Sequence, residues 1–411
     1  MKVVALADTD SYVKWSAALL GSLPAGIEAE LLIVETELVV SPGQQASALT
    51  RSGLEPARVR RVEYRDLADA LGRLAPDAVL VAARGPVARV LAALVAALTP
   101  RPVIVSGLPG ISIPATTAAM VHRTQCDLFV LHSTREIAAF SALARQRGLT
   151  QRFALAGLPF ARRMEAAPWS QTSTDLVFAS QAIVPRERAD RLRVARLLIE
   201  AAHQNPDKRV VVKERARAGE HQTHAQRHGY PELLGRMGTL PHNLVISTEP
   251  MARALDTAEG LVTVSSTAAI EAVARGIPVI ALDTFGIDDA LINTVFVGSG
   301  LLGSEADVVR RDFRLPPTAW LAQNYFHEPA EEDWIAEMVQ LVELRRAGQL
   351  PEKPARQRHG GRMRDVWERR MALGRKDRSL IGALVWGVGV PAKIVLRPVL
   401  RPFYRRRLGS I

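Results

Sequence analysis

Short apolar runs alternate with helical stretches along the first part of the chain. Such runs are typical of strands buried on both faces, and their alternation with helices predicts a parallel sheet with helices on both sides. We expect strands at 3–7, 30–34, 78–82, 102–106, 128–132 and 153–156, and helices at 13–23, 87–98 and 135–147.

The same alternation restarts after a break. Residues 157–174 hold two prolines and a run of small polar residues, which are typical of a linker. Beyond the break we expect strands at 176–180, 209–213, 244–247, 261–264 and 278–282, and helices at 186–203, 251–257, 267–275 and 333–346. Two such units place the carboxyl ends of their strands on either side of a cleft, where open α/β sheets bind ligands.

This pattern divides the chain into four parts. We expect a first Rossmann-like unit at 1–160, a linker at 161–174, a second Rossmann-like unit at 175–350 and a helical tail at 351–411. A length of 411 residues suits two domains with additions, and an apolar share of 48% is sufficient for two packed cores.

The net charge of +11 is concentrated in the tail. Residues 353–411 hold 16 Lys/Arg and 3 Asp/Glu, whereas the rest of the chain holds 37 basic and 39 acidic residues. A nearly neutral body argues against nucleic acid as a partner. A strongly basic tail indicates an anionic surface instead.

An uncharged apolar segment lies within this tail, at 379–392. Its fourteen residues are fewer than the roughly 20 that a helix needs to cross a bilayer. Arg378 and Lys393 flank it, and three aromatic residues lie within or after it, Trp386, Phe403 and Tyr404. This composition predicts an amphipathic tail that binds an anionic membrane surface. The alternative is a helix packed back onto the first unit, with its arginines in solvent.

The N-terminus and the cysteine content predict the compartment. The chain begins with an apolar strand, without the basic and long apolar regions of a signal peptide, so we expect none. The single cysteine, Cys126, excludes an internal disulfide and a cysteine-rich metal site, and it suits a reducing compartment. We therefore expect a cytoplasmic protein, peripheral on the inner face of the cell membrane.

The segment 260–286 carries the most informative chemistry. A strand ends at Val264, and Ser265, Ser266 and Thr267 form a small polar turn before a helix begins. Hydroxyls and backbone N–H groups at the N-terminus of a helix favour an anion, so this turn is a candidate phosphate site. The alternative is plain helix capping, for which Ser and Thr are common.

Two other strand ends in the second unit carry polar residues. One strand delivers Lys213 and Arg215 to its carboxyl end, where both would offset the charge of a leaving phosphate. The alternative is a solvated basic loop. Ser180 and Gln181 follow the first strand of this unit and are candidate contacts of the same ligand.

These motifs resemble the donor site of GT-B glycosyltransferases, and more narrowly that of the bacterial capsule-polysaccharide and polysialyltransferase-like branch. In that branch a strand ends in a Ser/Thr-rich turn, followed by a helix and a Gly-x-Pro strand. The matching residues here are Ser265, Ser266, Thr267, Glu271, Gly276 and Pro278. The resemblance implies a GT-B fold, in which two Rossmann-like domains face each other across a cleft. It also implies that the turn holds the donor's phosphate and that Glu271 contacts ribose or sugar hydroxyls.

The resemblance further implies the reaction. It indicates an inverting, metal-independent transfer of a sugar from a nucleotide-sugar donor to a cell-surface polysaccharide or glycolipid, with no permanently bound cofactor. Capsule-type enzymes carry Lys-x-His-Pro at one strand end. Here Lys213 matches but the His-Pro pair is absent, so His221 or His224 is the candidate for the histidine's role. The donor's base, and a hexosyl or a sialyl/Kdo-type sugar, stay open.

We expect the first unit to supply the acceptor side and the catalytic base. Asp8 and Asp10 follow the first strand, and either would deprotonate an acceptor hydroxyl; the alternative role of either is helix capping. Their spacing is that of a metal-binding Asp-x-Asp pair, but the resemblance implies no metal. Gly107 and Gly110 allow a close approach of a ligand to the backbone. Three further residues are candidates for this side, His122, Arg123 and His132.

Two alternative functions share these features. UDP-sugar 2-epimerases carry a similar turn on the same fold, but they would not need the basic apolar tail. A non-catalytic protein that binds a phosphorylated glycan or polyanion would use the same hydroxyl and basic groups without transferring a sugar.

Overall fold

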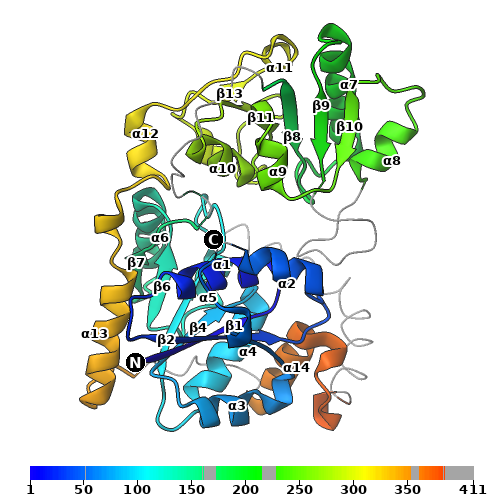
Figure 1. Ribbon diagram of the computed structural model, residues 1–411. Coiled ribbons are helices and arrows are strands. Elements are labelled where there is room, and N and C mark those ends of the chain that lie inside the picture. The colour runs from blue at the N-terminus through cyan, green and yellow to red at the C-terminus, as the bar shows by residue number, and fades with distance from the viewer. Residues whose placement is uncertain are drawn as a thin grey trace.

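Two parallel sheets, each with helices on both faces, form the body of the protein (Figure 1). The computed structural model describes residues 1–50, 52–159, 161, 173–214, 228–352, 361–382 and 384. The expected pair of Rossmann-like α/β units is confirmed. Nearly all of the expected linker at 161–174 lies outside the described residues.

Among the described residues, seven parallel strands form the first sheet, in the order β3-β2-β1-β4-β5-β6-β7. The strands are β1 (Lys2–Ala7), β2 (Glu28–Val34), β3 (Val59–Val62), β4 (Ala78–Ala82), β5 (Val103–Gly107), β6 (Leu128–Leu131) and β7 (Arg152–Leu155). The helices between them are α1 (Asp10–Gly21), α2 (Pro42–Leu49), α3 (Leu67–Leu74), α4 (Gly85–Ala96), α5 (Thr117–Val121) and α6 (Thr134–Gln146). The strand order reverses between β1 and β4, which is the switch point where such sheets bind ligands.

The second sheet repeats this arrangement with six described parallel strands, in the order β10-β9-β8-β11-β12-β13. These are β8 (Asp175–Ala179), β9 (Val210–Lys213), β10 (Leu244–Ser247), β11 (Ala258–Thr263), β12 (Val279–Leu282) and β13 (Leu302–Gly303). The accompanying helices are α7 (Arg188–Gln204), α8 (Tyr230–Gly235), α9 (Met251–Leu255), α10 (Ala268–Ala274), α11 (Glu305–Arg310) and α12 (Thr318–Gln323). Its switch point lies between β8 and β11.

Alternate residues of a strand pack on opposite faces of its sheet. In β1, Val3 and Ala5 belong to the core shared with α1, whereas Val4 and Leu6 belong to the core shared with α3 and α4. Successive side chains of a strand point to opposite faces. A strand covered on both sides is therefore apolar throughout, which explains the continuous apolar runs of the sequence.

The helix α13 (Trp334–Arg346) packs on the first sheet rather than the second. Trp334, Met338 and Leu341 are buried in the same core as α1, and the helix contacts β5, β6 and β7. Figure 1 shows it along the side of the first unit. The expected second unit at 175–350 therefore ends before this helix, which belongs to the first unit. Its apolar face predicted a helix but carried no sign of which sheet it would cover.

The tail folds back onto the first unit where the structure describes it. Helix α14 (Gly361–Leu373) lies beside α4 (Figure 1), and Leu373 is buried in the core formed with α3 and α4. Most of the apolar segment 379–392, to which the packed-back alternative applied, lies outside the described residues. No helix in the described part of the chain is long and apolar enough to span a membrane.

Candidate functional site

The switch point of the second sheet brings together two of the predicted donor residues. Gln181 follows β8 and Ser265 follows β11. The Gln181 amide donates to Ser265 Oγ over 3.0 Å, and the Ser265 backbone N–H donates to Gln181 Oε1 over 2.8 Å. Two neighbouring strand ends are thereby tied together at the edge where α/β sheets bind ligands.

The polar turn at 265–267 uses most of its own donors internally. The Ser266 N–H donates to Thr263 Oγ1 over 3.1 Å, and the Ala268 N–H donates to Ser266 Oγ over 3.2 Å. The Thr267 N–H has no partner among the described residues. Because Ser266 Oγ accepts this bond, its own O–H group is left to donate outward. The turn can therefore offer an anion one backbone N–H and the hydroxyls of Ser266 and Thr267.

Ser265 and Ser180 are buried, so their side chains hold neighbouring strand ends together rather than face solvent. Ser265 is 4% exposed and Ser180 is 3% exposed. Ser180 Oγ donates to Glu214 Oε2 over 3.0 Å, which connects β8 to the end of β9. Lys213 is also buried, and its ammonium group donates to the Glu214 carbonyl oxygen. These predicted donor residues thus meet at the carboxyl edge of the second sheet.

A buried arginine holds the loop that carries Gln181. Arg191 is 1% exposed, and its guanidinium donates to three backbone carbonyls, those of Gln181, Ala182 and Pro185, each over 2.8 Å. Three charge-assisted bonds to one loop leave it little freedom. Gln181 is therefore presented to Ser265 from a fixed backbone.

Glu271 lies on α10, one turn beyond the polar turn. Its carboxylate is 3.5 Å from the guanidinium of Arg275, which also pairs with Asp256 at 3.2 Å. The expected strand, turn and helix around Ser265–Thr267 are therefore all present, with Glu271 on the helix.

Three other predicted residues, Arg215, His221 and His224, lie outside the described residues. Within the described ranges, no group of three or more His, Cys, Asp or Glu side chains is arranged to hold a metal ion.

At the switch point of the first sheet, Asp8 is engaged by Arg84. Asp8 is fully buried at the end of β1. Its carboxylate accepts from the Arg84 side chain over 2.8 Å and from the Arg84 backbone N–H over 3.1 Å. Burial raises the pKa of Asp8, and the Arg84 charge opposes this shift. Asp10 differs: it begins α1 and is only partly buried. Asp10 is thus the more accessible of the two predicted carboxylates.

Arg84 was not predicted, although the sequence held the signal. It follows the apolar strand β4 just as Asp8 follows β1. Arg123 forms a second polar anchor at this edge. It is 1% exposed and donates to Tyr12 Oη over 3.0 Å, to Ser106 Oγ over 3.1 Å and to the Ala83 carbonyl over 2.9 Å. Arg123 therefore stabilises the edge and is not open to an acceptor.

His122 is held by Arg89, which was not predicted from the sequence. Arg89 of α4 approaches His122 Nδ1 at 2.7 Å and pairs with Glu368 of α14 at 3.0 Å. A permanently charged guanidinium can only donate, so His122 Nδ1 accepts and its proton lies on Nε2. The imidazole ring rests against Gly85, where a Cβ would overlap it.

Gly107 and His132 contribute to packing at the carboxyl edge of the first sheet. A Cβ at Gly107 would lie 2.6 Å from Trp15, so the glycine makes room for an indole rather than a ligand. Trp15 donates its indole N–H to His132 Nε2 over 2.7 Å, while His132 Nδ1 lies 2.9 Å from the Ala156 carbonyl oxygen. Burial lowers the pKa of His132 to about 4, so the ring is neutral and Nδ1 donates to Ala156.

The two sheet edges meet at Gly110. A Cβ at this position would lie 2.9 Å from Cγ2 of Thr267, across the boundary between the two units. Ile113, three residues later, shares a core with Ala268 and Ala269 of α10. The loop after β5 therefore lies directly against the turn that was predicted to hold phosphate.

A buried glutamate at the junction of the two units was also missed. Glu136 of α6 accepts from the Ser112 N–H over 2.7 Å, from the His132 N–H over 2.9 Å and from the hydroxyl of Tyr325 over 2.7 Å. Burial raises the pKa of Glu136 to about 7, although these donors oppose the shift. Ser133 and Glu136 form a Ser-x-x-Glu pattern, which in sequence indicates only a helix cap.

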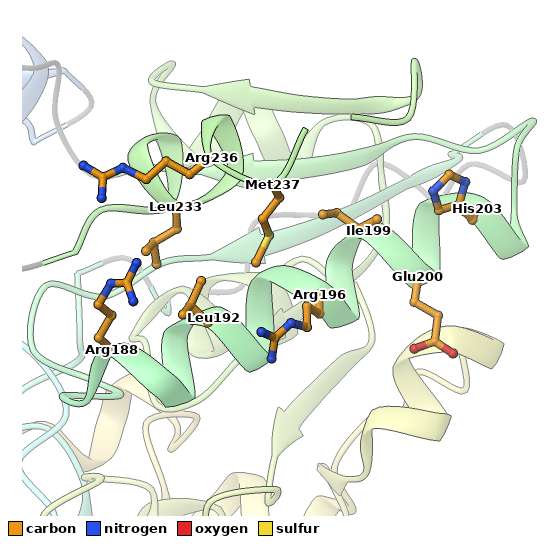
Figure 2. A pocket seen from close by; sticks show the side chains of 9 residues that line it. All are labelled: Arg188, Leu192, Arg196, Ile199, Glu200, His203, Leu233, Arg236 and Met237. Atoms are coloured by element: carbon orange, nitrogen blue, oxygen red, sulfur yellow. The ribbon is translucent and has the colours of Figure 1, made fainter. Parts of the chain in front are cut away.

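A shallow groove of about 600 Å³ lies elsewhere, between α7 and α8. Figure 2 shows arginines around an apolar floor, and its lining residues are Arg188, Leu192, Arg196, Ile199, Glu200, His203, Leu233, Arg236 and Met237. No predicted donor or acceptor residue lines it, so this groove is separate from the sheet edges.

Comparison with known families decides the assignment. Residues 3–341 match the model of the family described as "Putative glycosyltransferase (DUF6716)", which is most of the chain. The chain belongs to this family. A comparison with curated proteins gives no match.

Solved structures resemble this family member at the level of the fold. The MnaA protein of S. aureus with UDP has a TM-score of 0.54 at 11% identity, covering 86% of this chain and 99% of that one. The UDP-GlcNAc 2-epimerase of Neisseria meningitidis bound to UDP-GlcNAc gives 0.51 at 13%, covering 83% and 100%. The epimerase of Methanocaldococcus jannaschii with UDP-GlcNAc and UDP gives 0.54 at 11%, covering 83% and 99%. The expected GT-B fold is thereby confirmed.

Proposed function

We propose that the protein is an inverting, metal-independent glycosyltransferase of the capsule-polysaccharide type. It transfers a sugar from a nucleotide-sugar donor to a cell-surface polysaccharide or glycolipid at the inner face of the membrane. The observation that carries this proposal is the turn at 265–267, which lies at the switch point of the second sheet and against Gly110 of the first unit. Solved structures with the same fold contain UDP or UDP-GlcNAc, which supports a nucleotide-sugar donor.

In this proposal the donor's phosphate is held by the hydroxyls of Ser266 and Thr267 and by the Thr267 N–H. Backbone and hydroxyl donors that are fixed before the reaction stabilise a leaving phosphate without reorganising. Ser180, Gln181 and Ser265 position this turn through the bonds described above. Glu271 binds ribose or sugar hydroxyls. Lys213 belongs to the same site, as do two residues outside the described ranges, Arg215 and His224.

Asp10 is the proposed base. It takes the proton of an acceptor hydroxyl while the acceptor oxygen forms a bond to the anomeric carbon of the sugar. The bond from that carbon to the phosphate oxygen breaks, and the phosphate leaves with the electron pair. Asp8 positions the β1 edge through its pair with Arg84. Gly110 and His122 lie on the acceptor side.

A UDP-sugar 2-epimerase-like activity is the second candidate. It is favoured by the Neisseria and Methanocaldococcus structures, which are UDP-GlcNAc 2-epimerases with a similar fold. The two functions differ in their products. An epimerase converts the nucleotide sugar without an acceptor, whereas a transferase releases the nucleotide.

A thermal-shift series with CMP, UDP, GDP and dTDP nucleotides tests the donor site. We expect one nucleotide to raise the melting temperature of the wild type, and the Ser266→Ala/Thr267→Val variant to lose that shift. Ser304→Ala is the matched control, because Ser304 caps α11 by a hydroxyl but lies on a different helix. No shift with any nucleotide in the wild type would refute the proposal.

The variant Asp10→Asn tests the proposed role of Asp10 as the base in the transfer reaction. We expect it to keep the nucleotide-induced shift, because Asp10 lies on the opposite unit from the turn. Its transfer rate should fall by about 10²-fold or more, as is usual when a general base is removed. An unchanged rate would exclude Asp10 as the base.

A further inference from the structure

Helix α14 and the residues after it are fixed to the first unit on their inner side. Leu373 is buried in the core with α3 and α4. Glu368 pairs with Arg89 at 3.0 Å, and Lys376 pairs with Glu35 at 2.6 Å. These contacts join the segment 361–382 to three separate elements of the first unit. Figure 1 shows α14 next to α4.

The outer side of this segment is apolar and exposed. Five of the eleven exposed large hydrophobic side chains of the described residues lie here. They are Met363 at 61%, Met371 at 49%, Leu380 at 83%, Ile381 at 58% and Leu384 at 70%. Single exposed apolar residues are ordinary on a protein surface, but a concentration of them marks a contact surface.

The exposed charges of the same segment are mostly positive, although Arg364 pairs with Glu368 and Arg378 with Glu63. The exposed charged residues of the segment are Arg362, Arg364, Asp365, Arg375 and Arg378, four basic and one acidic. The chain then continues through 385–411 with six Lys/Arg and no Asp/Glu. The exposed surface of this segment is therefore both basic and apolar. The sequence at 385–411 is also basic and rich in apolar residues.

We propose that this outer face, formed by Met363, Met371, Leu380, Ile381 and Leu384 with Arg362 and Arg375, binds the surface of an anionic phospholipid bilayer. Apolar side chains enter the interfacial region while arginines contact lipid phosphates. An acidic protein partner would suit the arginines but would not require so many unpaired apolar side chains. The inference deepens the proposed function, on which it rests, by naming the surface through which the enzyme meets its membrane.

The same helix reaches the acceptor edge from its inner side. Glu368 holds Arg89, and Arg89 holds His122 Nδ1 at 2.7 Å. A bilayer bound to the outer face therefore lies on the unit that carries the acceptor side. This arrangement suits a lipid-linked acceptor, which would be presented from the membrane to which the helix is bound.

The test is sedimentation of the full chain with vesicles of phosphatidylcholine, with and without phosphatidylglycerol. We expect binding to the anionic vesicles, and binding at least about tenfold weaker to phosphatidylcholine alone, because each arginine near an anionic surface adds to the affinity. The variants Leu380→Ser/Ile381→Ser and Arg362→Gln/Arg375→Gln should each weaken anionic binding by about tenfold or more.

Two matched controls use other exposed surfaces. Val297→Ser/Leu315→Ser removes two exposed apolar side chains from the second unit, and Arg188→Gln/Arg196→Gln removes two arginines from the α7–α8 groove (Figure 2). Both controls should bind like the wild type. The inference is overturned if the wild type ignores anionic vesicles, if both outer-face variants bind as the wild type does, or if the controls lose as much affinity.

Nucleotide-induced thermal shifts on the same samples separate this inference from the proposed function. A protein that responds to a nucleotide but not to vesicles overturns the membrane face alone. A protein that binds vesicles through the outer face but responds to no nucleotide overturns the proposed function alone.

Discussion

Glu136 combines deep burial with three hydrogen-bond donors. It is fully buried and accepts bonds from Ser112, His132 and Tyr325. Tyr325 belongs to the segment between α12 and α13, so this carboxyl group ties α6 to the chain that connects the two units. The protonation state of Glu136 therefore affects the junction and not only its own helix.

The contribution of Glu136 to the stability of the protein should fall with rising pH. Its pKa is about 7 in the folded protein, above the ordinary value of about 4.3 for glutamate. The stabilisation that the neutral carboxyl group contributes is complete below about pH 4 and is lost as the pH rises through about 7. We expect the unfolding free energy of the wild type, relative to Glu136→Gln, to fall by on the order of 3 kcal/mol between about pH 4 and pH 8.

Denaturant unfolding of both proteins across this pH range measures the difference. Glu249→Gln is the control, because Glu249 is exposed, and its curve should run parallel to the wild type. A constant difference between the wild type and Glu136→Gln would show that Glu136 does not titrate in this range.

Sequence reasoning found the site residues that follow apolar strands, but not how they pair. Ser265 and Gln181 were both predicted, yet they are 84 positions apart, and only the strand order makes them neighbours. Asp8 was predicted without its partner Arg84 for the same reason. The sequence also cannot distinguish a buried hydroxyl such as that of Ser180 from an open one, because burial depends on the packing of the neighbouring strands.

Most strands were predicted closely, including the edge strand β10 at 244–247, but the edge strand β3 was not. The expected strand at 78–82 matches β4, and the expected helix at 267–275 matches α10 within one residue at each end. The edge strand β3 was missed. Its sequence Val-Arg-Arg-Val lacks a continuous apolar run, and its two central residues, Arg60 and Arg61, are both exposed. An edge strand pairs with one neighbouring strand only, so its sequence needs fewer consecutive apolar residues than that of a central strand.

The return of α13 to the first sheet gives a prediction for stability. Trp334 is 1% exposed in the core of the first unit, although it follows the whole second unit in the chain. Replacing a buried tryptophan by alanine costs about 3–5 kcal/mol. We therefore expect Trp334→Ala to lower the unfolding free energy by this amount and to reduce the protection of β5–β7 amides against hydrogen exchange.

Trp320→Ala is the matched control for this prediction. Trp320 is 5% exposed and packs in the core of the second sheet with α10. Its removal should expose amides of β11 and β12 and leave those of β5–β7 protected. If Trp334→Ala instead loosened the second sheet, the assignment of α13 to the first unit would be wrong.

The two units meet where the loop after β5 lies against the turn at 265–267. The proposed base Asp10 follows β1 of the first sheet, and the proposed donor turn follows β11 of the second. Arg135 of α6 adds a direct link, since its guanidinium donates to the carbonyls of Thr294 and Val295 over 3.0 and 2.8 Å. The contact between the two units is thus supported by several elements, and Gly110 lies within it.

Gly110→Val should separate transfer from donor binding. The new side chain would meet Thr267 Cγ2, because even a Cβ would lie 2.9 Å from it, so the two edges must move apart. The donor turn itself keeps its bonds to Gln181 and Thr263. A misplacement of about 1 Å between reacting groups reduces a rate by about 10²-fold. We expect a loss of this size in transfer rate, with nucleotide affinity nearly unchanged.

Gly235→Val is the control, because a Cβ there meets no other atom within 4 Å. A Gly110→Val variant that lost nucleotide affinity as much as rate would place this contact inside the donor site rather than between the units.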